Sequence, residues 1–270
     1  MDEQEKYDIL KREVDALQIQ LSKDRKPWHL KPSIIISMFA LIFSFGTTGV
    51  SYYKSHMEDI RANRSEAREL IQRITRLPIE NFELMQRNKG SAFGESLSGM
   101  LNQENIILGL QTAELIKRYP ESFTSSEYFA VAVALPQSNI RDNVPFLFKN
   151  AITRAKNYND YNVSTRAYAA YLFSQGDAVE GRRFYEMALS VWNKFPEKNP
   201  FVIHSMDLVT LMYWSNAELS INNPSKATDL ISRAKDCLTK LPPGPITESL
   251  ARQIADVEGR IEQSHSGGPR

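Results

Sequence analysis

Residues 165–196 read TRAYAAYLFSQGDAVEGRRFYEMALSVWNKFP, and this stretch decides the fold that the sequence predicts. Gly176 and Asp177 form a turn signal between two segments of helical length. Large and small apolar residues follow at helical spacing on both sides of this turn: Tyr168, Ala169 and Leu172 before it, and Gly181, Tyr185, Ala188 and Leu189 after it. Large residues fill the space between two packed helices, whereas small residues let the backbones approach. The stretch therefore predicts a helical hairpin.

Two further segments repeat this pattern. One begins at residue 128, and the other runs from residue 211 to residue 238 with a turn signal at residues 222–224. Their marker residues are Phe148, Ile152 and Ala155 in the first segment, and Trp214, Ser215, Ala227, Ile231 and Ala234 in the second. The corresponding small residues of the three copies lie 33 and 46 residues apart, at Ala155, Ala188 and Ala234. This repetition predicts an array of helical hairpins.

Residues 125–240 resemble an array of tetratricopeptide repeats (TPR), helical hairpins with a period of about 34 residues. The gap of 33 residues matches this period, and residues 196–207 supply the extra length of the gap of 46. The chain departs from the family at Thr165, where Trp is usual, and at Glu218, where an apolar residue is usual. The resemblance implies an all-α fold containing an α-solenoid of TPR-like helical hairpins that binds proteins or peptides.

The other residues of the stretch 78–270 extend the same helical pattern and contain no alternating strand pattern. Residues 90–118 predict one or two helices. From about Thr247 a last helix places its apolar residues on one stripe, as the end cap of a solenoid requires; they are Leu250, Ile254, Val257 and Ile261. We expect a TPR-like repeat domain over residues 78–263 and a disordered tail over residues 264–270.

An uncharged run of 22 residues lies between Lys31 and Lys54. As a helix, residues 33–53 would be roughly 31 Å long, which matches the hydrocarbon core of a bilayer. The aromatic residues near its two ends are Trp28, Tyr52 and Tyr53. A buried core helix and a cleaved signal peptide are the alternatives, but the apolar part of a signal peptide is shorter and lies nearer the start. The run therefore predicts a single transmembrane helix, with the lipid bilayer as its partner.

Positive charge close to this span favours a cytoplasmic N-terminus, because residues 23–32 carry four Lys or Arg and residues 54–63 carry two. Over twenty residues on each side, the count reverses to four against five. The layout resembles bacterial inner-membrane proteins that have a short cytoplasmic N-terminus, one anchor and an external helical-repeat domain. We expect a single-pass protein of the bacterial inner (plasma) membrane, with residues 78–270 outside the cytoplasm.

Helix-spaced apolar residues flank the span on both sides. Residues 1–32 predict a short amphipathic or coiled-coil helix whose seam is Tyr7, Leu10, Val14, Leu17 and Leu21. Residues 54–77 predict a juxtamembrane helix whose seam is Met57, Ile60, Ala67, Ile71 and Ile74, interrupted by Arg64. Small residues four apart within the span allow close helix approach; they are Ala40, Ser44 and Thr48. Together these patterns predict a parallel homodimer through residues 1–77, and a single helix on the membrane surface is the alternative for residues 1–32.

Charge and motif patterns favour a protein without catalysis. The 33 Lys and Arg nearly balance the 32 Asp and Glu, so there is no electrostatic footprint for nucleic acid. The single cysteine, Cys237, and the four histidines form no metal-ligand motif. Residues 90–99 match neither a phosphate loop nor a nucleophile elbow, and we interpret them as a helix-capping loop. The sequence predicts no catalytic residues, no metal site and no cofactor, so the protein is not expected to be an enzyme.

The resemblance places a peptide-binding groove on first-helix residues outside the packing face, namely Arg166, Ala170, Phe173, Met212, Asn216 and Leu219. Arg166 and Asn216 would hydrogen-bond an extended peptide or its carboxylate. We therefore expect a membrane-anchored, non-enzymatic scaffold or adaptor that presents its TPR-like domain for protein–protein interaction. The alternative is a membrane-bound sensor or regulator whose helical domain binds a small ligand and signals through the flanking coiled segments.

Overall fold

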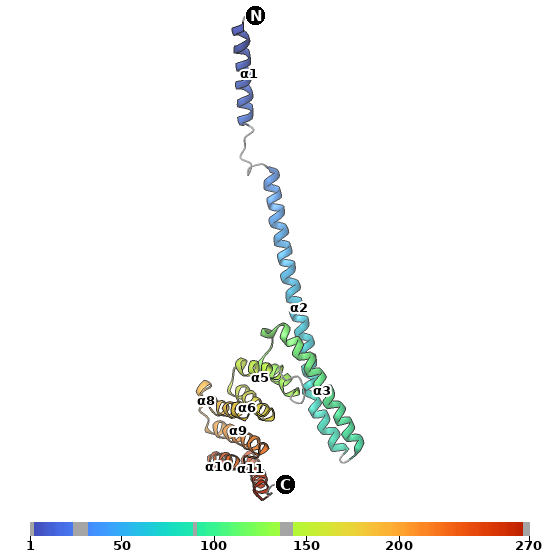
Figure 1. The fold of residues 1–270 in the computed structure, drawn as a ribbon, viewed down its shortest axis with the longest axis vertical. Coiled ribbons are helices and arrows are strands. Elements are labelled where there is room, and N and C mark those ends of the chain that lie inside the picture. The colour runs from blue at the N-terminus through green and yellow to red at the C-terminus, as the bar shows by residue number, and fades with distance from the viewer. Residues whose placement is uncertain (1–2, 24–31, 89–90, 136–142, 267–270) are drawn as a thin grey trace. The chain divides into compact units, whose positions relative to one another are not determined.

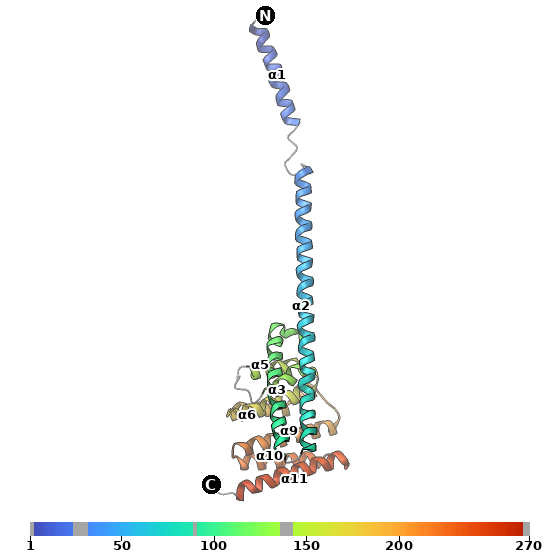
Figure 2. The same ribbon diagram turned by 90° about the vertical axis from the view of Figure 1, so that its right-hand side faces the viewer.

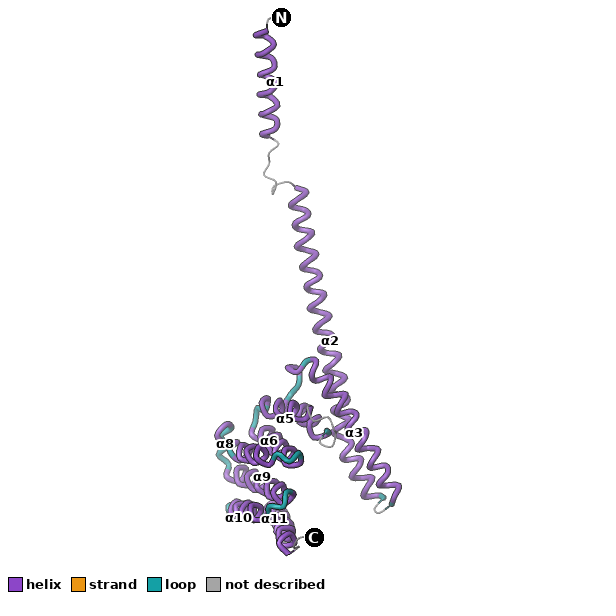
Figure 3. Tube along the Cα trace, in the orientation of Figure 1, coloured by secondary structure: helices purple, strands orange, loops and turns teal. Residues whose placement is uncertain are grey.

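The computed structural model describes residues 3–23, 32–88, 91–135 and 143–266. Within these ranges all regular structure is helical and there is no strand (Figure 3), which confirms the all-α prediction. Trp28, near the start of the predicted span, and residues 267–270 of the predicted tail lie outside the described ranges. The helices are α1 (Glu3–Lys23), α2 (Pro32–Arg87), α3 (Ala92–Arg118), the 3₁₀ helix η2 (Pro120–Ser122), α4 (Ser125–Ala134), α5 (Asn143–Arg154), α6 (Tyr158–Ser174), α7 (Ala178–Leu189), α8 (Val191–Lys194), α9 (Pro200–Ser220), α10 (Pro224–Leu238) and α11 (Pro245–Ser266).

The chain divides into two compact units, Met1–Arg61 and Ala62–Arg270. In the first unit, the described seam side chains of α1 are all exposed; they are Tyr7, Leu10, Val14 and Leu17. Among the described helices, α2 alone contains a segment that is long and apolar enough to cross a membrane. No residue of its most apolar window is buried, so that window does not form a core inside the chain.

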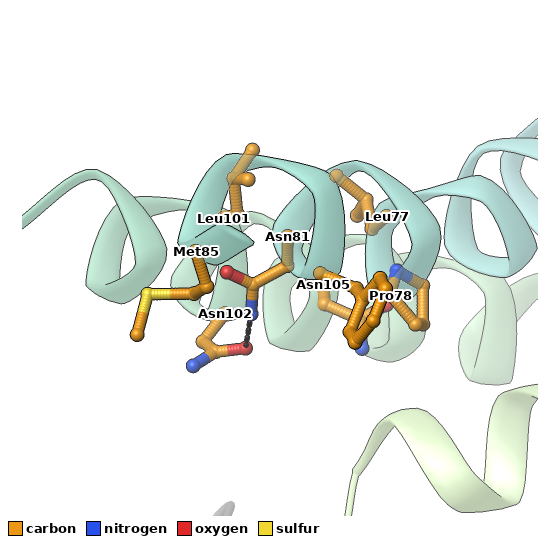
Figure 4. A pocket seen from close by; sticks show the side chains of 8 residues that line it. Leu77, Pro78, Asn81, Met85, Leu101, Asn102 and Asn105 are labelled. Atoms are coloured by element: carbon orange, nitrogen blue, oxygen red, sulfur yellow. Dashed lines mark hydrogen bonds between the residues drawn. The ribbon is translucent and has the colours of Figure 1, made fainter. Parts of the chain in front are cut away.

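Helix α2 extends further than the sequence predicts. The predicted juxtamembrane helix ends at residue 77, but α2 continues through Pro78 to Arg87. Proline inside a helix removes one backbone hydrogen bond and costs about 3 kcal/mol, so packing on both sides of Pro78 must hold the helix together. One such contact follows Pro78 by less than one helical turn: Asn81 donates a hydrogen bond of 3.4 Å from its Nδ2 to Oδ1 of Asn102 on α3 (Figure 4).

The second unit begins with a pair of helices, since α3 lies beside the C-terminal part of α2 in both views (Figures 1 and 2). The seam residues of α2 in this region are buried within the chain, together with Ala113 and Ile116 of α3; they are Ala67, Ile71 and Ile74. Arg73 spans the pair and bonds Glu80 and Glu104. The predicted seam over residues 57–74 therefore serves intramolecular packing at its C-terminal end, and those residues are not free to face a second copy.

The remaining helices pack in chain order. Helix α4 packs on α5, α6 on α7, and α9 on α10, and α6, α9 and α11 then contact α5, α7 and α10 respectively (Figures 1 and 2). Small residues lie where the helices cross, since Ala169, Ala188 and Ala234 are all 0% exposed. The turns fall at the predicted punctuation, where Gly176 (φ +82°) and Asn222 (φ +59°) adopt the left-handed backbone that Gly and Asn tolerate best.

One buried hydrogen bond recurs in two successive helix pairs. The Ser125 hydroxyl of α4 donates to the Ala151 carbonyl of α5 (2.7 Å), and the Asn162 amide of α6 donates to the Ala188 carbonyl of α7 (3.0 Å). Donor and acceptor both shift by 37 residues, from 125 to 162 and from 151 to 188. This bond makes Ala151 the counterpart of Ala188, whereas the sequence pattern had aligned Ala155 with it. The polar anchor fixes the register, and apolar spacing alone cannot reveal it.

Candidate functional site

A cleft with a volume of about 460 Å³ opens among α4, α5, α6 and α9. Most of its wall is aromatic or aliphatic, and the largest contributors are Phe129, Val133, Phe148, Val163, Tyr171 and Tyr213. Two polar side chains also line it, Arg166 and Ser174. Clefts of this size, mainly apolar with a few polar groups, are typical of ligand-binding sites in proteins.

Arg166 supplies the charge of this cleft. Its guanidinium carbon lies 4.5 Å from the ring centroid of Tyr213, so the cation rests on an aromatic face. Burial lowers the pKa of Arg166 from its usual value, because removal from water disfavours the charged form. No carboxylate forms a salt bridge with Arg166 in the described part of the chain. A guanidinium stays protonated in proteins, so this half-buried charge can still pair with an anion that enters the cleft.

The predicted groove residues separate into two groups. Arg166 and Ala170 line the cleft. Phe173 and Met212 are each only 4% exposed and fill the core, so they offer almost no surface to a ligand. Asn216 and Leu219 are half-buried and lie outside the residues that line the cleft. The structure therefore does not bring the six predicted residues together on one surface.

Stacked rings hold the wall of the cleft in place. The Phe148 ring lies 5.4 Å from that of Tyr168 and 6.1 Å from that of Tyr171, measured between centroids. Tyr168 in turn meets Phe184 edge-on at 4.6 Å. Such pairs contribute about 0.5–1.5 kcal/mol each beyond the area they bury. The cleft therefore has a rigid wall before any ligand enters.

Sequence reasoning did not find the aromatic residues that α4, α5 and α9 contribute to the cleft. Tyr213 carried the clearest signal, since it is an aromatic residue between Met212 and Trp214, which both point into the core. At helical spacing, a residue between two core positions projects to a different side of the helix. Phe129 carried no comparable signal, because its role depends on where α4 packs.

A second polar feature lies in the core beside the cleft. The Glu218 carboxylate is fully buried and accepts hydrogen bonds from Arg182 Nε (2.7 Å) and Nη2 (2.8 Å), from Trp214 Nε1 (2.9 Å) and from Asn223 Nδ2 (2.9 Å). Burial by itself raises the pKa of Glu218, but these donors favour the ionised form and bring its pKa below 4.5. Glu218, which stands where tetratricopeptide repeats usually have an apolar residue, is therefore a hydrogen-bonded charge that joins α7, α9 and the turn before α10.

Three sequence features bear on catalysis: possible metal ligands, the single cysteine and residues 90–99. Among the described residues, no three His, Cys, Asp or Glu side chains gather as metal ligands would. Burial raises the pKa of the Cys237 thiol, which opposes thiolate formation. Ser91 accepts a hydrogen bond from the Gly94 amide and caps α3, as predicted. The predicted loop over residues 90–99 is otherwise wrong, because residues 92–99 form the first turns of α3.

A smaller cavity of about 290 Å³ lies between α2 and α3, beside Pro78 and Met85 (Figure 4). No charged side chain lines it. Its polar groups are the neutral amides of Asn81, Asn102 and Asn105. The cleft at Arg166 is larger and carries a charge, so it is the stronger candidate. The chain matches no protein-family model, no curated protein and no solved structure.

Proposed function

We propose that this chain is a single-pass membrane scaffold whose TPR-like domain, over residues 78–263, binds partner proteins through the cleft at Arg166. The carrying observation is the guanidinium of Arg166, which lies in an aromatic cleft with no carboxylate bonded to it in the described part of the chain. Such a cleft suits an extended peptide that places an apolar side chain against the rings and a carboxylate on Arg166.

The recurring hydrogen bond supports the repeat part of this proposal. A solenoid stacks equivalent units so that each buries the face of the next. The Ser125 and Asn162 bonds lie at equivalent points of two successive helix pairs, and each pair packs on its neighbour. The apolar stripe on α11 agrees with an end cap, since Leu250, Ile254 and Val257 are buried while the opposite face is exposed.

The membrane part of the proposal rests on residues 33–53. No other part of the chain covers the apolar side chains that the structure describes here, and those of Phe39, Phe43 and Phe45 are exposed. Exposure of so many large apolar groups to water is unfavourable, whereas lipid would cover them. We propose the bacterial inner membrane as the location, with the N-terminus in the cytoplasm and the TPR-like domain outside it.

This topology predicts the behaviour of C-terminal reporter fusions. A reporter that works only outside the cytoplasm should be active when fused after residue 270, and one that works only inside should be silent. A fusion after residue 32 should give the opposite pattern and serves as the control. Activity of the cytoplasmic reporter alone at residue 270 would reverse the orientation.

Replacing Arg166 by Met tests the binding proposal. We expect the variant to lose at least about tenfold in affinity for its partners, because a hydrogen bond to a charged group contributes about 1.5–3 kcal/mol. Proximity labelling in cells, with the full chain compared with an anchor-only control, identifies the partners. Affinity is then measured on the purified full chain.

Arg252→Met is the matched control, because Arg252 is an exposed arginine on α11 far along the chain from the cleft. The partner proteins should still be enriched with this variant, and their enrichment should drop with Arg166→Met. Equal enrichment in both variants would remove Arg166 from the site. If no protein exceeds the anchor-only control, the scaffold proposal fails.

A second candidate function is a membrane-bound sensor for a small ligand. The observation that favours it is the size of the cleft, about 460 Å³, which suits a small molecule as well as a peptide segment. A thermal-shift screen of the full chain against small carboxylic acids separates the two functions. A saturable shift that Arg166→Met abolishes would favour the sensor.

Self-association through α1 is the remaining part of the proposal. The seam residues Leu10 and Leu17 are 63% and 58% exposed, so a parallel second copy would cover them. Changing both to Asp should abolish dimers, because it would place charges inside the seam. Single cysteines at positions 10, 14 and 17, in a Cys237→Ser background, report dimers by disulfide trapping.

The matched control changes Lys11 and Gln18 to Asp, since both lie one residue beyond the seam positions. Dimers should survive this change. Absence of crosslinking at every seam position in the otherwise unchanged chain would contradict self-association and leave a monomeric scaffold.

A further inference from the structure

A second cleft, with a volume of about 740 Å³, lies at the other end of α4 from Phe129 and Val133. Helix α2, the segment 121–126 and the connection from α5 to α6 enclose it. Its wall is polar, in contrast to the cleft at Arg166. Its lining includes the cations Arg64, Arg154 and Lys156 and the hydroxyl of Ser126.

Arg64 has no bonded partner in this cleft. It occupies the position where the α2 seam is interrupted, and it is half-buried. Its Nε is shielded from solvent and donates to no acceptor, and within the described ranges no carboxylate forms a salt bridge with its guanidinium. Removing such a charge from water without a partner is costly. An apolar residue would suit the seam better, so packing does not explain this arginine.

A second arginine reaches the same cleft. Arg154 bonds Glu121 through Nη2 (2.8 Å), while its Nε is also shielded and unpartnered. The Glu121 side chain is 87% exposed, so this pair is solvated and weak. Lys156 adds a third, exposed cation beside the two arginines.

Two carboxylates, Glu121 and Asp160, also line the cleft. Glu127 bonds Arg68 (2.8 Å) and closes the capping box of α4 with Thr124. Asp160 accepts a hydrogen bond from the Asn157 amide (2.9 Å) at the start of α6. The lining therefore carries three positive charges (Arg64, Arg154 and Lys156) and two negative ones (Glu121 and Asp160), a net charge of +1. Within the described ranges no carboxylate forms a salt bridge with Arg64, so its charge is the one left for an anion.

We propose that this cleft binds a phosphate group, with Arg64 as the principal contact and Arg154 and Lys156 around it. A guanidinium presents several N–H donors that match the oxygens of a phosphate, and a flexible lysine adds a point charge. The hydroxyl of Ser126 lines the same space and can donate to a further oxygen. The group belongs to a free phosphate compound or to a phospholipid head group. This site is separate from the partner cleft and does not depend on it.

Inorganic phosphate is the probe, titrated into the purified full chain in detergent micelles at constant ionic strength, with chloride as the comparison salt. At ten times the dissociation constant, phosphate should raise the melting temperature by about 3 °C or more, and the rise should follow the logarithm of the phosphate concentration above that point. Arg64→Met should abolish this shift. Arg76→Met, which removes an exposed arginine from the same helix, should retain it.

A second readout separates binding from a fold defect. Without phosphate, Arg64→Met should melt no lower than the unchanged chain, because it removes an uncompensated charge. Saturating phosphate should reverse that order. The proposal is overturned if the unchanged chain and Arg64→Met respond equally, or if chloride gives the same shift as phosphate.

Nanodiscs distinguish the two sources of the phosphate group. One outcome is that phosphatidylglycerol in the discs raises the melting temperature of the unchanged chain above that of Arg64→Met while inorganic phosphate does not. In that case the ligand is a lipid head group. If inorganic phosphate produces this difference in discs that lack anionic lipid, the ligand is a free phosphate compound. No difference under either condition overturns the site.

Discussion

Replacing Glu218 by Ala is expected to lower the free energy of unfolding by about 1–3 kcal/mol, the cost of leaving a buried hydrogen-bond donor unsatisfied, because the partly exposed Arg182 can be solvated. The carboxylate is fully buried, and its removal leaves the side chains of Arg182, Trp214 and Asn223 without their acceptor. Urea unfolding of the full chain in micelles, followed by tryptophan fluorescence, measures the change. Trp214 lies at the site and reports it directly.

The double variant Arg182→Met with Glu218→Leu is the matched control. It removes both charges and supplies apolar groups, so it should recover most of the stability lost in Glu218→Ala. A double variant as unstable as the single one would contradict the ion-pair explanation. The loss would then be one of packing volume.

The pH dependence of stability provides an independent check. The pKa of Glu218 is lower in the folded chain than its ordinary 4.5, so ionised Glu218 stabilises the fold above about pH 4.5. That stabilisation is lost as the pH falls through the folded-state pKa. The stability difference between the unchanged chain and Glu218→Gln should therefore shrink on acidification below pH 4.5. A difference that stays constant down to pH 3 would contradict the assignment.

Replacing Gly181 by Ala is expected to destabilise the chain by about 1–3 kcal/mol, the usual cost of overpacking a core. A Cβ at this position would lie 2.5 Å from Cδ2 of Phe173 and 3.2 Å from the carbonyl oxygen of Ala169. The ring of Phe173 is itself buried and packs on Tyr185 at 5.9 Å, so it has little space to move away. The same urea titration measures this change.

Gly259→Ala is the matched control, because Gly259 also lies within a helix and no atom comes within 4 Å of its added Cβ. There the better helix propensity of Ala acts alone and should stabilise α11 by about 0.5–1 kcal/mol. Equal effects at the two positions would show that propensity, and not close packing of α6 on α7, explains Gly181.

The sequence predicts the helical class, the order of the main helices and several turns, because these depend on local patterns. Ala169, Gly181 and Ala188 are small residues at helical spacing, and all three are buried where helices meet. Gly176 and Asn222 mark turns through their own backbone preferences. The end of α2 escapes the same reasoning, because Pro78 locally favours a helix end and packing against α3 overrides that preference.

The candidate site depends on tertiary structure more than the helices and turns do. The resemblance to tetratricopeptide repeats selected Arg166 and Ala170, which line the cleft, but it also selected Phe173 and Met212, which are buried. A helical repeat pattern shows that a residue lies off one packing face, but it does not show what packs on the other faces. The neighbours of Arg166 come from α4, α5 and α9, and their placement requires the assembled helices.

By itself the sequence determined the all-α class, the uncharged segment over residues 33–53 and the pairing of neighbouring helices, because composition and short-range periodicity govern these features. Only the tertiary structure decided that Glu218 is a bonded core charge, that Arg64 and Arg154 share one cleft, and that the α2 seam packs on α3. Each of these depends on contacts between residues distant along the chain, such as the 36 residues that separate Arg182 from Glu218. Local sequence patterns do not predict such contacts, because they form only when whole helices pack.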